Sequence, residues 1–132
     1  MANLIVVCID NDETILDGMQ TLMDRWGCDV HVFSQSKPLL KAIKDISPDI
    51  ILADYHLDQE NGLDVVCSAR EQTHVDLPAI LITADRSAAV RNAAEALEIT
   101  VMNKPLKPAA LRALFGRLAN KNAKGKAPTA AE

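Results

Sequence analysis

Polar side chains that could share one chemistry stand at the ends of four apolar runs. They are Asp10, Asn11 and Asp12 after LIVVCI, Asp54 after IILA, Thr83 at the end of AILIT, and Lys104 after ITVMN. Carboxylates that are crowded together raise one another's pKa unless a cation is present. An oxygen-only cluster suits Mg²⁺, which binds few protein ligands together with waters and phosphate oxygens. The residue types therefore fit transfer of a phosphoryl group to Asp54, with a hydroxyl and an ammonium binding its oxygens.

Taken singly, these residues have more common structural explanations. A carboxylate after a strand is more often a helix cap, which is what we expect of Asp12. Thr83 could cap the helix that follows it, and an isolated lysine such as Lys104 is usually a solvated charge. His56 is more often a loop residue than a ligand. Only their joint placement at successive strand ends favours a shared site.

The spacing of apolar residues predicts the elements that would position this site. Unbroken apolar runs are typical of strands buried on both faces, and the alternating DVHVF run indicates a half-exposed edge strand. The five predicted strands cover 4–9, 29–33, 50–53, 79–83 and 99–102. Helical patterns between them predict an α/β fold with a parallel sheet covered by helices on both faces. Ligands of such sheets bind beyond the carboxyl ends of the strands.

Five helices are predicted between and after the strands. We expect them at about 12–26, 36–47, from 62 onward, 85–97, and from 108 to about 120. The first is expected to bury Ile15, Met19, Leu22, Met23 and Trp26. The segment 85–97 is rich in alanine, so its apolar face is thin and we expect it to be loosely anchored.

The composition limits the classes of protein to which this chain can belong. The chain has 132 residues, is 48% hydrophobic and carries a net charge of −4, which argues against a nucleic-acid partner. No apolar run approaches the roughly 18 residues that would cross a membrane. Three scattered cysteines in apolar patterns favour reduced thiols and a cytoplasmic protein. We predict one domain over 1–120 and a disordered tail over 121–132.

The segments VVCIDND, IILADYHLDQENGLD, LITAD and MNKPLKP resemble the response-regulator receiver domains of two-component signalling. The resemblance runs from residue 4 to about 119. It implies a doubly wound, flavodoxin-like sheet of five parallel strands in the order 2-1-3-4-5. It also implies a phosphoacceptor that is not a conventional enzyme, but catalyses its own phosphorylation and dephosphorylation. The implied partner is a histidine kinase or a histidine phosphotransfer domain. A homodimer through the face of helix 4, strand 5 and helix 5 is a further expectation.

The resemblance also assigns roles to individual residues. It places the phosphoacceptor at Asp54, the switch hydroxyl at Thr83 and the phosphate-binding lysine at Lys104. The Mg²⁺ ligands that it implies are Asp10, Asn11, Asp54 and the backbone carbonyl of His56.

Two positions depart from the family pattern. Asn11 stands where the second member of an acid pair is expected, so we expect weaker Mg²⁺ binding that is not abolished. Val101 stands three residues before Lys104, where many receivers carry an aromatic ring. An inward swing of that ring is therefore not available, and we expect any signal to pass through Thr83 and the 84–97 segment.

Two other functions compete with the receiver prediction. DNDET, residues 10–14, fits the signature of haloacid-dehalogenase-like phosphatases with Asp10 as nucleophile, although no acidic pair follows Lys104. A degenerate receiver that serves only as a binding module is the second alternative, and Asn11 supports it. Details such as ITADRS and KPLKPAALRALF look most like the receiver module at the C-terminal end of a hybrid sensor histidine kinase.

Overall fold

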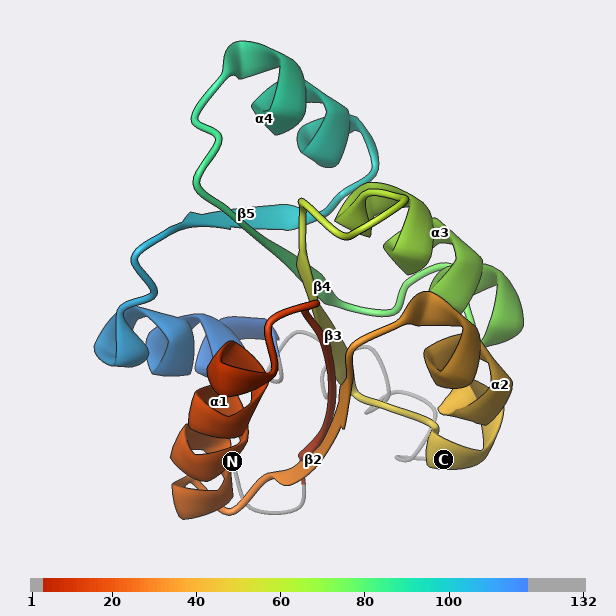
Figure 1. Cartoon of the computed structure of the whole chain (residues 1–132), viewed down its shortest axis with the longest axis vertical. Helices are drawn as coiled ribbons and strands as arrows, with labels where there is room; N and C mark the ends of the chain where they lie inside the picture. Colours follow the sequence, from red (N-terminus) through yellow and green to blue (C-terminus); the bar gives the residue numbers. More distant parts are fainter. Residues whose placement is uncertain (1–3, 119–132) are drawn as a thin grey trace, which may run out of the picture.

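The computed structural model describes residues 4–118, which build a parallel five-stranded sheet between two layers of helices (Figure 1). The strands are β1 (Ile5–Ile9), β2 (Asp29–Phe33), β3 (Ile50–Asp54), β4 (Ala79–Thr83) and β5 (Thr100–Asn103). They pair in the order β2-β1-β3-β4-β5, and every pair is parallel. The predicted α/β sheet with strand order 2-1-3-4-5 is confirmed, with β2 at one edge.

The helices alternate with the strands as predicted. They are α1 (Glu13–Arg25), α2 (Ser36–Ile46), α3 (Gly62–Gln72) and α4 (Ala88–Ala96). A fifth helix, which we call the C-terminal helix, runs from residue 108 to 118, the last position described. The boundary predicted at 120 and the tail predicted over 121–132 lie outside the described residues.

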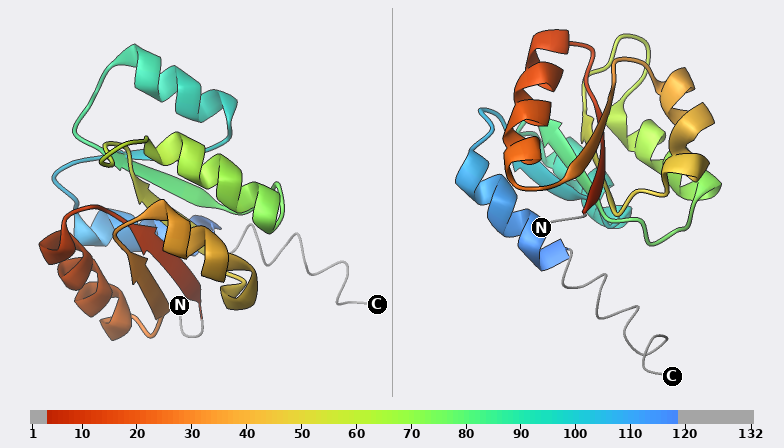
Figure 2. Two further views of the ribbon diagram at one scale, coloured as in Figure 1. Left: turned by 45° about the vertical axis from the view of Figure 1, so that its right-hand side comes forward. Right: turned by 90° about the horizontal axis from the view of Figure 1, so that it is seen from below.

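The core has two layers because neighbouring strand residues point to opposite faces of the sheet. Val7, Ile51 and Leu81 pack with α2, α3 and α4 on one face. Their neighbours in sequence, such as Leu52 and Ile80, pack with α1 and the C-terminal helix on the other. Figure 2 shows the helices on the two faces of the sheet. Coverage of both faces explains why β1, β3 and β4 read as unbroken apolar runs.

The apolar face predicted for α1 is right in part, since Met19 and Met23 are buried and Leu22 and Trp26 are half-buried. Asp12 caps the helix as expected, with its carboxylate accepting hydrogen bonds from the backbone N–H groups of Thr14 and Ile15. Ile15, however, is 37% exposed, while Leu16 is buried together with Met19. Successive helical residues point about 100° apart. The stripe that includes Leu16 therefore faces the sheet and turns Ile15 towards solvent.

The predicted start of α4 is also wrong, by one turn. The helix begins at Ala88 instead of Asp85, because Ser87 is its N-cap and accepts a hydrogen bond from the N–H of Val90. Within α4, only Val90 and Ala94 are buried, which confirms the thin apolar face. β5 beneath it is accordingly half-buried along its length.

Arg70 of α3 holds the far end of α4. Its Nε donates to the carbonyl of Leu77 at 3.1 Å, and its two terminal nitrogens donate to the carbonyls of Leu97 and Glu98 at 2.5 and 3.1 Å. Leu97 is the C-cap of α4, and Glu98 has a positive φ of 55°. One guanidinium therefore satisfies carbonyls just before β4 and just after α4, using the planar fork that lysine lacks.

Gly62, the first residue of α3, lies directly against the end of β3. Its N–H donates to the carbonyl of Tyr55 at 3.0 Å. A Cβ at this position would overlap the carbonyl oxygen of Asp54 and come within 2.9 Å of Leu81 Cδ1. Backbone cannot yield as a flexible side chain can, so the close approach requires glycine.

We therefore expect Gly62→Ala to destabilise the chain by about 1–3 kcal/mol, the usual effect of overpacking a rigid site. Gly18→Ala in α1 is the matched control, since a Cβ there meets nothing within 4 Å. An alanine inside a helix is favoured by about 0.5–1 kcal/mol over glycine, so this variant should gain stability. Urea unfolding measures the free energy of unfolding of both variants. Equal stability of the two variants would contradict the close approach.

Candidate functional site

The strand register brings the predicted site residues to one rim of the sheet. Ile9 pairs with Ala53, so Asp10 and Asp54 follow side by side at the ends of β1 and β3. Thr83 ends β4 and pairs with Asn103, the residue before Lys104. Asp10, Asp54 and Thr83 are 3%, 5% and 0% exposed. Within residues 4–118, these three are the polar or charged residues that are buried.

Lys104 reaches Asp54 across the end of β4. Its Nζ lies 3.0 Å from Asp54 Oδ1, and its side chain is 31% exposed. The backbone N–H of Lys104 donates to the carbonyl of Thr83 at 2.9 Å, and the following bond to Pro105 is cis. The lysine is thus anchored through its backbone while its ammonium contacts the central carboxylate.

Asp10 is the second buried carboxylate. Its Oδ1 accepts the backbone N–H of Asp12 at 2.8 Å. Burial is the main influence on the pKa of Asp10 and raises it. The charge of Asp54 raises it further, while the Asp12 hydrogen bond and the ammonium of Lys104 lower it. Two carboxylates thus share one ammonium, and this excess of negative charge suits a cation.

Thr83 begins a chain of hydrogen bonds that ends in α4. Its Oγ1 accepts the N–H of Asp85 at 2.9 Å, and Asp85 Oδ1 accepts the N–H of Ser87 at 2.8 Å. Ser87 Oγ accepts the N–H of Val90 at 3.3 Å. The bonds from Ser87 also hold the pKa of Asp85 below its ordinary value. We call this series the Thr83–Val90 ladder. Because the threonine acts here as an acceptor, its own O–H proton is left to donate elsewhere.

Asn11 and His56 lie at the open side of the rim. Both side chains are exposed. His56 stands in the loop after β3, where its ring packs edge-on against Tyr55 with centroids 4.8 Å apart. Asn11 Nδ2 donates to Asp58 Oδ1 at 2.7 Å. Sequence reasoning missed Asp58. It could be seen as an acid four residues after Asp54, but spacing alone does not show that it meets Asn11.

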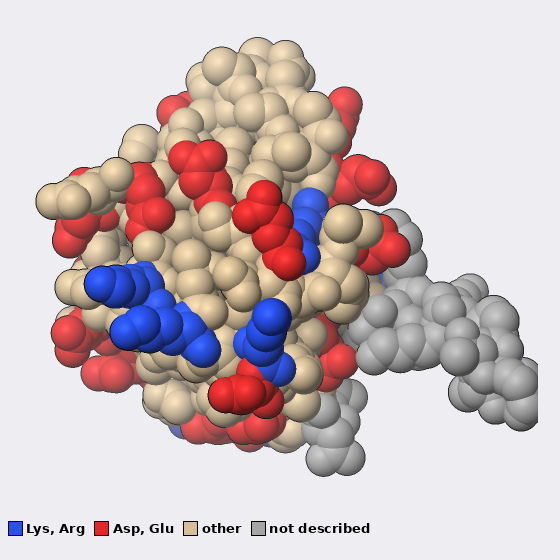
Figure 3. Space-filling model, turned by 90° about the vertical axis from the view of Figure 1, so that its right-hand side faces the viewer, with Lys and Arg blue, Asp and Glu red and all other residues tan. Residues whose placement is uncertain are grey.

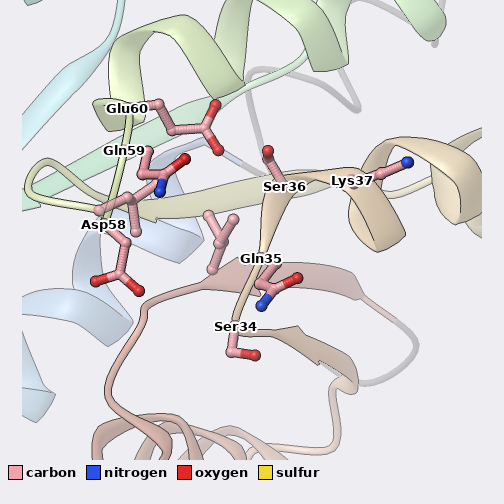
Figure 4. A pocket seen from close by; sticks show the side chains of 9 residues that line it. Ser34, Gln35, Ser36, Lys37, Asp58, Gln59 and Glu60 are labelled. Carbon is pink, nitrogen blue, oxygen red and sulfur yellow. The ribbon is translucent and has the colours of Figure 1, made fainter.

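Beside the acidic site lies a hollow of about 300 Å³. It is lined by residues 34–37, which end the β2–α2 loop and begin α2, by residues 57–60 of the β3–α3 loop, and by Ile9 (Figure 4). Asp58 belongs to its wall, but Asp54 does not. The hollow is therefore a neighbour of the site and not the site itself.

The surface beyond the hollow carries charges of both signs. Lys37, Lys41 and Lys44 are exposed on α2. Figure 3 shows basic side chains gathered over the α2 part of this face, with acidic ones around them. This face is therefore not the continuous basic surface that a nucleic acid would need. Among the described residues, no helix is long and apolar enough to cross a membrane.

Comparison with known proteins gives this fold and site a family. The model of the response regulator receiver domain matches residues 6–116. The chain therefore belongs to the response-regulator receiver family, whose members are signalling modules of two-component systems and not conventional enzymes.

Individual relatives agree with this assignment. PhoP of Bacillus subtilis, the alkaline phosphatase synthesis transcriptional regulatory protein, is 29% identical over 79 residues, which are 60% of this chain and 32% of that protein. The DNA-binding response regulator MtrA of Mycolicibacterium smegmatis is 27% identical over 79 residues, which are 60% of this chain and 34% of MtrA. The chain thus matches about a third of each relative's length.

Solved structures show the same fold. A CheY-like receiver domain from Methanospirillum hungatei superposes with a TM-score of 0.86 at 18% identity, covering 94% of this chain and 99% of that one. The chemotaxis protein CheY4 of Vibrio cholerae gives a TM-score of 0.82 at 20% identity, covering 89% and 99%.

The electrostatics of Asp10 lead to a pH-dependent expectation for protein freed of divalent cations. Its pKa in the folded chain lies above the ordinary 3.8. Between these two values the folded chain binds more protons than the unfolded chain, so stability falls as pH rises through that window. Asp10→Asn keeps an oxygen for the Asp12 N–H but carries no charge. It should therefore raise the free energy of unfolding at pH 7 and flatten its pH dependence.

Urea unfolding across pH values in the presence of a chelator measures this effect. Asp64→Asn is the matched control, because Asp64 is an exposed acid of α3. It should keep the pH dependence of the unmodified chain. A lower unfolding free energy for Asp10→Asn at pH 7 would contradict the electrostatic account.

Proposed function

We propose that this receiver domain accepts a phosphoryl group on Asp54 from the phosphohistidine of a histidine kinase or a histidine phosphotransfer domain. The observation that carries the proposal is the setting of Asp54. Its side chain is 7% exposed and lies 3.0 Å from the Lys104 ammonium, and the residue ends a strand next to Asp10. A structural ion pair alone does not account for a second buried acid beside it, since that acid adds repulsion.

The proposed transfer is a single in-line displacement. A carboxylate oxygen of Asp54 attacks phosphorus, the P–O bond forms, and the P–N bond to the donor imidazole breaks with its electron pair returning to the ring nitrogen. Negative charge then accumulates on the phosphoryl oxygens, which is where an enzyme places its electrostatic stabilisation. Lys104 already stands within contact distance of Asp54. Its ammonium binds one of these oxygens, and the Thr83 hydroxyl donates to another.

The donor set fits Mg²⁺. Asp10 and Asp54 supply carboxylate oxygens, and we assign further oxygens to the Asn11 amide and the His56 backbone carbonyl. All are hard oxygen donors, as Mg²⁺ prefers. Within the described residues, no group of three His, Cys, Asp or Glu side chains could hold a metal, so the neutral oxygens have to complete the set. When bound, the ion neutralises charge as the phosphoryl group approaches the carboxylate.

Phosphorylation would be read out through Thr83. When its hydroxyl turns to a phosphoryl oxygen, the Thr83–Val90 ladder links that movement to the start of α4. Val101 is half-buried against the core and supplies no aromatic ring to report the change. The face of α4, β5 and the C-terminal helix is therefore the proposed surface for output or for pairing with a second copy. His56 and Asp85 flank the entry and would tune hydrolysis of the aspartyl phosphate.

Three further predictions stay open beside this function. The hybrid-kinase origin rests on sequence details alone, while the two relatives described above are a transcriptional regulatory protein and a DNA-binding response regulator. The sequence of the full-length gene product tests it. The phosphatase alternative, with Asp10 as nucleophile, could use Thr83 and Lys104 but leaves Asp54 without a role, and the degenerate receiver predicts no labelling at all.

Labelling with acetyl phosphate separates these functions. In the presence of Mg²⁺, we expect one phosphoryl group per chain on Asp54, and its complete loss in Asp54→Asn, since the amide cannot attack phosphorus. Mass spectrometry after borohydride reduction identifies the labelled residue. Asp64→Asn is the matched control and should label fully.

Three outcomes would refute the assignment. Full labelling of Asp54→Asn, or label found on Asp10, would favour the phosphatase. No label on the unmodified chain with Mg²⁺ present would favour the degenerate receiver.

A further inference from the structure

The bond between Asn11 and Asp58 fixes the orientation of an amide at the proposed metal site. Asn11 Nδ2 lies 2.7 Å from Asp58 Oδ1. An ionised carboxylate only accepts hydrogen bonds, so the group of Asn11 that meets it is the NH₂ and not the oxygen. The usual ambiguity between the two ends of an amide is therefore absent here. The amide oxygen of Asn11 is kept away from Asp58.

This orientation matters because Asn11 is a one-sided ligand. A carboxylate presents two equivalent oxygens to a cation, whichever way it turns. An amide presents one oxygen, and its NH₂ end repels a cation. An asparagine in this position binds a metal only if something holds the NH₂ end elsewhere. Asp58 does this from a different loop, the one that follows β3.

We propose that Asp58 is a positioning residue for Mg²⁺, which compensates for the neutral Asn11. The inference rests on the proposed function, since it concerns the same metal site. A carboxylate bonded to a metal ligand orients it and makes its donor atom more basic. A hydrogen bond to a charged acceptor is about twice as strong as a neutral one. Asp58 also restores, one bond away, the negative charge that Asn11 lacks.

The neighbouring side chains give the inference a clean control. Figure 4 shows the Asp58 carboxylate turned away from Gln59 and Glu60, towards the β1–α1 loop that carries Asn11. Glu60 belongs to the same loop and is exposed like Asp58. Glu60→Ala therefore removes the same charge from the same segment without touching the bond to Asn11.

The experiment is a Mg²⁺ titration of the full chain by isothermal titration calorimetry. Asp58→Ala should weaken binding about tenfold, the lower end of the usual effect of such outer partners, because both side chains are exposed. Glu60→Ala should change binding by less than about twofold. The Mg²⁺ affinity of Asp58→Asn, whose amide oxygen can still accept the hydrogen bond, should lie between those of the other two variants.

The decisive comparison uses Asn11→Asp. This variant should bind Mg²⁺ more tightly than the unmodified chain, and adding Asp58→Ala to it should cost less than about twofold, because an aspartate needs no orienting partner. The difference between the two backgrounds is the coupling of a double-mutant cycle. In metal-free protein, Asp58→Ala should also shift the side-chain NH₂ resonances of Asn11, which a general charge effect would not single out.

Failure of this inference differs from failure of the proposed function. Equal losses in both backgrounds, or equal losses for Asp58→Ala and Glu60→Ala, would overturn the positioning role while Mg²⁺ binding and Asp54 labelling persist. No Mg²⁺ binding by the unmodified chain or by Asn11→Asp would overturn the metal site of the proposed function, and this inference with it.

Discussion

The burial of two neighbouring carboxylates is the constraint on which the rim of this sheet depends. Asp10 and Asp54 are both almost inaccessible, and two like charges in such a place destabilise the fold unless counter-charges surround them. The Asp12 N–H and the Lys104 ammonium provide part of this compensation. The remaining repulsion between the two carboxylates is what the proposed Mg²⁺ would neutralise.

Parallel pairing makes this arrangement possible from residues that are far apart in the chain. Asp10 and Lys104 lie at the same edge of the sheet because every strand runs in the same direction. The rigid part of the site is built from strand ends, whereas Asn11, His56 and Asp58 come from loops. The sheet thereby fixes the position of the Asp54 carboxylate, whereas loop residues line the approach to it and can vary without disturbing the sheet.

The sequence predicted strand ends well and loop contacts poorly, for a physical reason. A strand buried on both faces shows as an unbroken apolar run, so the first polar residue after it, such as Asp54 or Thr83, can be placed at the rim. The start of α4 was misplaced because Ser87 competes as a cap with Asp85, and both residue types favour that role. The contacts of Asp58 and Arg70 join distant segments, and no local pattern encodes them.

The attachment of α4 has a mechanical consequence. The helix buries only Val90 and Ala94 along its length, while its first turn is tied through Ser87 and its C-cap, Leu97, through Arg70. The helix is therefore held mainly at its two ends and packs weakly against the core between them. Of these two attachments, the Arg70 guanidinium makes two bonds to the backbone directly after α4 and a third to Leu77 before β4. In the proposed function, a small displacement at Thr83 would therefore tilt α4 as a rigid helix, with an amplitude set by the length of the helix and without repacking of the core.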